Sequence, residues 1–238
     1  THRRVRHRYQ SDMRQILLIL VSLNLTVFGG PRVPRELPEG VILEKDLPYL
    51  APGRGERLDL YRPVSRAAGK GSPAVVIIHG GGWVGGDKGA DREFVTGTAL
   101  AKAGYVGASI NYRLEGRDRW PQNLHDCKNA VRWLRVNADR LGIDPERIGV
   151  IGGSAGGHLA MMVAYTAGHP GLDPGALYAG VSDKVSACVN MYGIANLVTR
   201  RKTDRDGTPN GPPAGHALFP ESRESAPAKW KLASPVTH

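Results

Sequence analysis

Ser154 stands between glycines directly after a short apolar run, in the stretch ERIGVIGGSAGGH (146–158). A serine hydroxyl that projects from a sharp strand-to-helix turn can attack a carbonyl carbon. In such a turn the two backbones pass so closely that the residues two before and two after the serine cannot carry a Cβ. Gly152 and Gly156 occupy these positions. The pattern predicts a nucleophile elbow that presents Ser154 at the carboxyl edge of a sheet.

A second glycine corner follows an apolar run in AVVIIHGGGWVGG (74–86). Attack on an ester carbonyl places negative charge on oxygen, and backbone N–H groups in a loop without side chains can approach that charge closely. Three consecutive glycines meet this need, and the elbow aims the amide of Ala155 toward the same charge because a helix begins there. A nucleotide site is disfavoured, because no Gly-Lys-Ser or Gly-Lys-Thr follows and neither corner matches GxGxxG.

Strand and helix patterns alternate along the chain, which predicts an α/β fold with a doubly wound, mostly parallel sheet and right-handed crossovers. The expected strands span 41–50, 57–61, 74–78, 105–112, 147–152 and 184–193, and the expected helices span 91–102, 121–141 and 155–167. The first two strands are expected to form an antiparallel pair joined by the turn APGRG. Residues 195–229 lack apolar periodicity and are predicted to form an irregular surface insertion.

Four motifs in order resemble the α/β-hydrolase superfamily, in its secreted esterase branch near hormone-sensitive-lipase-like and feruloyl or acetylxylan esterase-like enzymes. These motifs are HGGGW (79–83), NYRL (111–114), LHDCKNAVRWLR (124–135) and GGSAGGHLA (152–160). The resemblance covers about residues 41–194 and begins again at ASPVTH (233–238). It implies an α/β-hydrolase domain over 31–238 that is incomplete at its C-terminal end.

The resemblance implies a serine carboxylic-ester hydrolase that acts on short-chain or carbohydrate-linked acyl esters through an acyl-enzyme, without a cofactor or metal. Ser154 is then the nucleophile, and the amides of Gly81, Gly82 and Ala155 form the oxyanion hole. Trp83, in the same loop, is a further candidate for the oxyanion hole and for the substrate pocket. The alternative is a non-catalytic protein that keeps the fold as a binding module. A peptidase of the prolyl-oligopeptidase kind is disfavoured, because no propeller-like region precedes the domain.

The base and acid of a triad are not evident after Ser154. In the family the order is serine, then Asp or Glu, then His, each after a further apolar strand. The later candidates are His158, His169, His216 and His238, with Asp173, Asp183, Asp204, Asp206, Glu221 and Glu224. None follows such a strand, and His158 is expected to face away from the base position. The chain is therefore expected to end after the sixth of eight core strands, with the acid and the histidine beyond His238. By itself it is expected to hydrolyse esters poorly.

Other polar residues are expected to have structural roles. His125 and Asp126 precede the nucleophile at the start of a helix, where an Asp commonly pairs with the helix dipole or an arginine. His79 is expected to brace the glycine loop. Asp87 and Lys88 are expected to be surface loop residues.

The charge of the chain does not indicate nucleic-acid binding. Of the 238 residues 41% are apolar and 23% charged, and the net charge is +10. Residues 1–30 hold five arginines and one acid, and the remaining basic residues are scattered without a basic stripe interleaved with aromatics. The expected partner is a small-molecule or polysaccharide-linked ester.

Residues 1–30 have the layout of an upstream extension followed by a secretory signal that starts at Met13. The apolar stretch from Ile16 to Phe28 is about 13 residues, short of the roughly 20 that a spanning helix needs. Export to the periplasm or medium is therefore expected, with no membrane span after cleavage. Export would permit a disulfide between Cys127 and Cys188, but their apolar settings favour free buried thiols.

Overall fold

The computed structural model describes residues 35–65, 69, 71–114, 119–203, 209–213 and 217–238, with the backbone alone described at 201–203 and 209–213. Contacts divide the chain into two compact units, 1–38 and 39–238. Only 35–38 of the first unit are described, so the predicted signal segment lies outside the described residues. Within the described ranges, every helix is too short or too polar to cross a bilayer.

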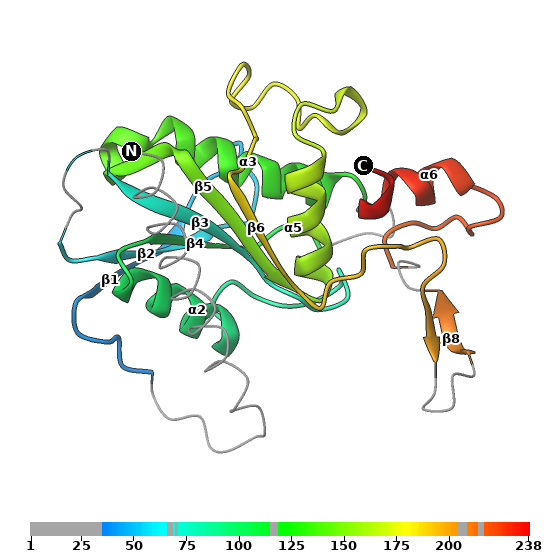
Figure 1. Ribbon diagram of the computed structural model, residues 1–238, viewed down its shortest axis with the longest axis horizontal. Coiled ribbons are helices and arrows are strands. Elements are labelled where there is room, and N and C mark those ends of the chain that lie inside the picture. Colours follow the sequence, from blue (N-terminus) through cyan, green and yellow to red (C-terminus); the bar gives the residue numbers. More distant parts are fainter. Residues whose placement is uncertain (1–34, 66–68, 70, 115–118, 204–208, 214–216) are drawn as a thin grey trace, which may run out of the picture. The chain divides into compact units, whose positions relative to one another are not determined.

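A six-stranded sheet forms the centre of the second unit, in the order β1-β2-β4-β3-β5-β6 (Figure 1). Its strands are β1 (Val41–Leu47), β2 (Leu58–Pro63), β3 (Ser72–Ile78), β4 (Val106–Ile110), β5 (Ile143–Gly153) and β6 (Ala187–Met191). The strand β2 is antiparallel to β1 and β4, whereas β4, β3, β5 and β6 are parallel. The strands that follow β3 are added on both of its sides, β4 on one and β5 and β6 on the other. This order confirms the predicted doubly wound, mostly parallel sheet.

The crossover helices cover both faces of this sheet (Figure 1). They are α2 (Asp91–Lys102), α3 (Gln122–Val136) and α5 (Ala155–Tyr165). Helix α2 packs on β2 and β4, while α3 and α5 pack on each other and on β3 and β5. All five residues of β4 are buried, as expected for a parallel strand that is covered on both faces.

The helix predicted at 121–141 is interrupted for one residue. Asn137 has φ −95° and ψ 13°, and its side-chain amide donates to the Trp133 carbonyl at 2.8 Å. The Asn137 backbone amide donates to the same carbonyl at 3.1 Å, and the helix resumes one residue later as α4 (Ala138–Leu141). Gly142 then ends α4 with φ 67°, the left-handed conformation that favours glycine at this position.

The segment after β6 corrects the prediction of a wholly surface insertion at 195–229. Its elements are the antiparallel pair β7 (Arg201–Thr203) and β8 (Pro209–Pro213), helix α6 (Pro227–Leu232) and the 3-10 turn η2 (Pro235–Thr237). Leu197, Leu218 and Phe219 are buried in the main core. Phe219 packs edge-on to Trp230 of α6 with ring centroids 4.8 Å apart. Isolated apolar residues leave no periodic signal, which explains why the sequence pattern missed them.

The two cysteines are free thiols, as their apolar settings favoured. Cys127 is buried in α3 and Cys188 is half-buried in β6. Burial raises the pKa of the Cys188 thiol to about 11, so this thiol stays protonated at neutral pH.

Candidate active site

The chain turns sharply at Ser154, between the end of β5 and the start of α5. Ser154 has φ 55° and ψ −121°, and a positive φ is unfavourable for a residue with a side chain. A Cβ on Gly152 would overlap the carbonyl oxygen of Gly156, and a Cβ on Gly156 would overlap the carbonyl oxygen of Ile78. Backbone packing therefore requires glycine at both positions that the sequence pattern singled out.

Two backbone hydrogen bonds stabilise this strained turn. The Ser154 amide donates to the Met191 carbonyl of β6 at 3.0 Å, and the His158 amide donates to the Ser154 carbonyl at 3.0 Å. The serine is half-buried, and in the described part of the chain its hydroxyl has no hydrogen-bond partner. The strain is thus supported from both sides, and the hydroxyl is free to reach a ligand.

Replacing Gly156 with alanine is expected to lower the free energy of unfolding by about 3 kcal/mol, because the added methyl group would push α5 away from β3. Urea denaturation measures the change. Gly104→Ala is the matched control: Gly104 also has a positive φ of 85°, but nothing lies within 4 Å of its added Cβ. The control should lower the free energy of unfolding by only about 1 kcal/mol, because alanine is less favourable than glycine in the left-handed backbone conformation. Equal costs for the two variants would contradict the packing argument.

The glycine loop that follows β3 lies beside the serine turn. Ile78 at the end of β3 pairs with Gly152 of β5, so the two loops leave the sheet from neighbouring strands. A Cβ on Gly80 would lie 3.4 Å from the Ser154 Cβ and 2.9 Å from the Gly153 carbonyl oxygen. The structure thus brings together the two corners that lie about 70 residues apart in the sequence.

Two backbone amides of the glycine loop have no acceptor among the described residues. Gly81 and Gly82 have φ 120° and 61°. The Gly81 carbonyl accepts hydrogen bonds from the amides of Val84 and Gly85, each at 3.1 Å, which closes the turn. Among the residues that the structure describes, none accepts from the amides of Gly81 and Gly82. Ala155 is the first residue of α5, where amides have no acceptor within the helix.

His79 braces the loop, the role expected from the sequence. Its ring stacks on Tyr112 with centroids 4.4 Å apart, and the Tyr112 hydroxyl donates to the His79 carbonyl at 3.0 Å. The Nδ1 of His79 lies 2.7 Å from the Gly80 carbonyl oxygen and donates to it. Burial lowers the pKa of His79, so the ring is neutral near pH 7.

Trp83 and His158 join the loop to α5 and to the C-terminal segment. The indole N–H of Trp83 donates to Nδ1 of His158 at 3.2 Å. Nδ1 is therefore unprotonated, and Nε2–H donates to the Ala233 carbonyl at 2.7 Å. Trp83 is 4% exposed and packs in the core, and its place in a substrate pocket stays a prediction. His158 is buried and bonded to Trp83 and Ala233, in agreement with the structural role expected from the sequence.

The burial of His158 should make stability depend on pH. Burial lowers its pKa from 6.5 to about 4. Below pH 6.5 the unfolded chain takes up a proton that the folded chain resists, so the free energy of unfolding falls as the pH falls. The full effect between pH 6.5 and 4 is about 3 kcal/mol. Urea denaturation across this range should show a smaller slope for His158→Gln, because His79 and His125 still contribute, and the parent slope for His238→Gln, at an exposed position. An unchanged slope in His158→Gln would refute the assignment.

Lys88 is buried, which corrects its expected place on the surface. Its side chain is 10% exposed, and Nζ lies 2.8 Å from Asp46 Oδ1 and 2.9 Å from Asp59 Oδ1. The Lys88 amide donates to the Asn111 side-chain oxygen at 2.6 Å. Asp87 is exposed, as expected, and accepts from the Asn111 amide at 2.9 Å. These contacts anchor the end of the glycine loop to β1 and β2.

Asp126 is an arginine partner rather than half of a catalytic pair with His125. It accepts hydrogen bonds from the Arg54 guanidinium at 2.7 Å and from the Arg113 amide at 2.9 Å. Burial raises the pKa of Asp126, against the opposing effect of Arg54, and burial lowers the pKa of His125. The structural roles expected for both residues agree with these contacts.

The described histidines that follow α5 lie away from Ser154. The His169 amide donates to the Thr166 carbonyl at the far end of α5, and the His169 and His238 rings pack edge-on at 5.5 Å. The 11 residues of α5 separate its two ends by about 16 Å. Neither ring can reach the serine hydroxyl, and His216 lies outside the described residues.

The acids after Ser154 have other partners or fall outside the described ranges. The described ion pairs are Asp173 with Arg132 at 2.9 Å, Asp183 with Lys128 at 2.8 Å and Glu221 with Lys229 at 3.1 Å. Asp204 and Asp206 are outside the described residues. The triad acid and base beyond His238 therefore stay a prediction.

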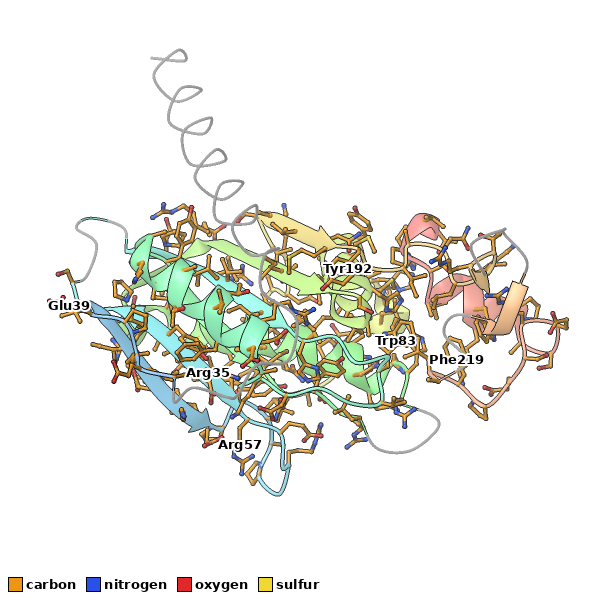
Figure 2. All side chains as sticks on the ribbon, turned by 90° about the horizontal axis from the view of Figure 1, so that it is seen from below. Arg35, Glu39, Arg57, Trp83, Tyr192 and Phe219 are labelled. Atoms are coloured by element: carbon orange, nitrogen blue, oxygen red, sulfur yellow. The ribbon has the colours of Figure 1, made fainter. Side chains whose placement is uncertain are left out.

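Sequence reasoning missed two residues beside the serine turn, Arg92 and Tyr192. The Arg92 Nη1 donates to the Tyr192 hydroxyl at 2.7 Å, directly over the backbone of Gly153. Figure 2 shows Tyr192 and Trp83 toward the end of the sheet from which the C-terminal segment leaves. The one signal in the sequence is Gly153 itself, because a glycine at this position leaves room for side chains from other elements.

A surface hollow of about 770 Å³ lies at the end of β4 and does not include Ser154. It is lined by Gly53, Arg54, Gly55, Glu56, Asn111, Tyr112, Arg113 and Leu114. The hollow lies at the end of β4, whereas Ser154 follows β5, and β3 runs between these two strands.

Comparisons with known proteins agree with this arrangement. The model of one protein family, BD-FAE, matches residues 58–238. Esterase LipQ of Mycobacterium tuberculosis is 29% identical over 208 residues, which are 87% of this chain and 48% of LipQ. Esterase LipC of the same organism is 38% identical over 136 residues, which are 57% of this chain and 33% of LipC. The chain thus spans about half or less of the length of these relatives.

Solved structures show the same fold. A truncated form of a carbohydrate esterase from gut microbiota has a TM-score of 0.69 and 26% identity, and the match covers 82% of this chain and 72% of that one. The α/β-hydrolase esterase resemblance and the fold class predicted from the motifs are therefore confirmed.

Proposed function

Because this chain belongs to the BD-FAE family, we propose that it is a serine carboxylic-ester hydrolase, or the part of one, with Ser154 as nucleophile. One observation carries the proposal: a strained serine with an unpartnered hydroxyl lies beside a glycine loop whose amides lack acceptors in the described part of the chain. Such a site can present a hydroxyl and hydrogen-bond donors to the same carbonyl group.

In the proposed reaction Ser154 Oγ attacks the ester carbonyl carbon and passes its proton to a general base. The bond to the alcohol then breaks, the alcohol leaves with a proton, and water hydrolyses the acyl-enzyme. The amides of Gly81, Gly82 and Ala155 are proposed to stabilise the oxyanion, each contributing about 3 kcal/mol. The positive end of the α5 dipole favours the same charge.

The acid and the histidine of the triad are proposed to lie beyond His238, in a longer polypeptide. No described histidine forms a hydrogen bond with the Ser154 hydroxyl, which supports this placement. The same observation favours the second candidate, a non-catalytic α/β-hydrolase-fold binding module. The two proposals differ in whether Ser154 becomes nucleophilic when the polypeptide continues.

The proposed substrates are short-chain or carbohydrate-linked acyl esters. The names of LipQ and LipC as esterases and the carbohydrate esterase among the solved structures support these classes. We also propose that the protein is exported, because its first 30 residues have the layout of a secretory signal. N-terminal sequencing of protein recovered from the periplasm or medium tests export, and an uncleaved N-terminus there would oppose it.

A fluorophosphonate probe tests the proposed function. In the polypeptide extended past His238, the probe should label Ser154, as mapped by mass spectrometry of the labelled peptide, and Ser154→Ala should not be labelled. A folded, extended polypeptide that the probe leaves unmodified would favour the binding module instead.

A further inference from the structure

Arg92 and Tyr192 occupy the space beside the nucleophile that a side chain at position 153 would fill. A Cβ on Gly153 would lie 2.7 Å from Arg92 Nη1 and 2.9 Å from the Tyr192 hydroxyl oxygen. Arg92 belongs to the first turn of α2, and Tyr192 directly follows β6. Two elements 100 residues apart therefore place this pair next to Ser154.

Hydrogen bonds to Glu93 fix the Arg92 side chain. Nε and Nη2 of Arg92 donate to Glu93 Oε1 at 2.9 and 2.6 Å, and Glu93 is only 2% exposed. The buried carboxylate neutralises the guanidinium and sets the direction of its fork. The remaining group, Nη1, is thereby directed at the Tyr192 hydroxyl.

Tyr192 is both strained and exposed. Its φ is 50°, and its side chain is 69% exposed, although it is a large aromatic residue. Among the described residues the ring adds little to the core, so its packing there does not explain a backbone conformation that costs about 1–3 kcal/mol. The turn is maintained by the Gly193 amide, which donates to the Asn190 side-chain oxygen at 2.7 Å. Strain of this kind concentrates at ligand sites.

The chemistry of the pair points to an oxygen-rich ring. The Tyr192 oxygen accepts from Arg92, so the hydroxyl proton is free to be donated, and a bond from a cation strengthens that donor. The exposed ring offers a flat apolar face beside the donor. A sugar ring matches both features, with oxygen acceptors at its edge and C–H groups on its face.

We propose that Tyr192 binds the sugar ring of an acylated carbohydrate whose ester group lies at Ser154, and that Arg92 is the positioning residue for the Tyr192 hydroxyl. The proposal rests on the proposed function for the placement of the ester. It adds the residue that distinguishes a sugar ester from a simple ester.

Binding to the Ser154→Ala form of the chain tests this proposal without requiring turnover. The probes are methyl xyloside triacetate and phenyl acetate, and saturation-transfer NMR gives the Kd of each. Tyr192→Phe keeps the ring and removes the hydroxyl, so it should weaken binding of the sugar triacetate about tenfold and that of phenyl acetate by less than about twofold. Tyr165→Phe, which alters an exposed tyrosine at the other end of α5, should change neither Kd.

Arg92→Lys tests the positioning role, because lysine keeps a cation for Glu93 but lacks the planar fork. It should weaken binding of the sugar triacetate as much as Tyr192→Phe does, and the double variant should bind no worse than Tyr192→Phe. Additive losses would overturn the role of Arg92. Equal binding of the sugar triacetate with and without the Tyr192 hydroxyl, or no binding to the Ser154→Ala parent, would overturn the proposal. A chain that binds the sugar through Tyr192 but resists the fluorophosphonate probe when extended would refute only the hydrolase.

Discussion

Replacing Ser154 with alanine is expected to lower kcat for p-nitrophenyl acetate by about 10⁴- to 10⁶-fold in the polypeptide that carries the complete triad. Alanine removes the hydroxyl oxygen that is proposed to form the acyl-enzyme, and the proposed oxyanion donors alone should give a small residual rate. Initial rates with purified protein measure the loss. The variant should fold normally, because the serine hydroxyl has no hydrogen-bond partner in the described part of the chain.

Ser222→Ala is the matched control for this prediction, since Ser222 is exposed and lies in the C-terminal segment. It should keep the parent rate. A Ser154→Ala protein that retains a tenth of the parent rate would exclude Ser154 as nucleophile. Robust turnover by the 238-residue chain, abolished in Ser154→Ala, would instead place the base inside the chain and leave His216 as its candidate.

Replacing Lys128 with methionine is expected to lower the free energy of unfolding by about 3–5 kcal/mol. The Lys128 side chain is fully buried; its Nζ lies 2.8 Å from Asp183 Oδ2 and donates to the Thr166 carbonyl at 2.6 Å. Without the ammonium group, Asp183 would be a buried charge without a counterion. Urea denaturation at pH 7 measures the loss.

Two further variants separate the charge effect from the loss of packing. Lys102→Met, at an exposed position of α2, should change the free energy of unfolding by no more than about 0.5 kcal/mol. Lys128→Met combined with Asp183→Leu should recover most of the stability, because no isolated charge then remains. If Lys128→Met costs no more than Lys102→Met, the pair does not stabilise the junction of α3, α5 and the segment before β6.

The parts of the fold that were predicted correctly depend on local pattern. The aliphatic run at 74–78 indicated a strand covered on both faces, and Asp91–Lys102 was identified as a helix with its observed bounds. The parts that failed depend on contacts with distant residues. Lys88 appears polar and exposed in its own segment, but Asp46 and Asp59 cover it from other strands. Three buried residues of the core lie in a segment without helical or strand periodicity in its apolar residues: Leu197, Leu218 and Phe219.

The sequence by itself determined the position of the serine turn and the glycine corner beside it. At each corner a Cβ in place of glycine would overlap backbone atoms of a nearby segment. The turns are short, so glycines that directly follow a strand are enough to predict a tight corner there. The tertiary structure alone decided which side chains surround the corner. Arg92 meets Tyr192 across 100 residues, and Trp83 meets His158 across 75. Such pairs form because strand order brings distant segments to one edge of the sheet, and strand order is a property of packing rather than of any single stretch of sequence.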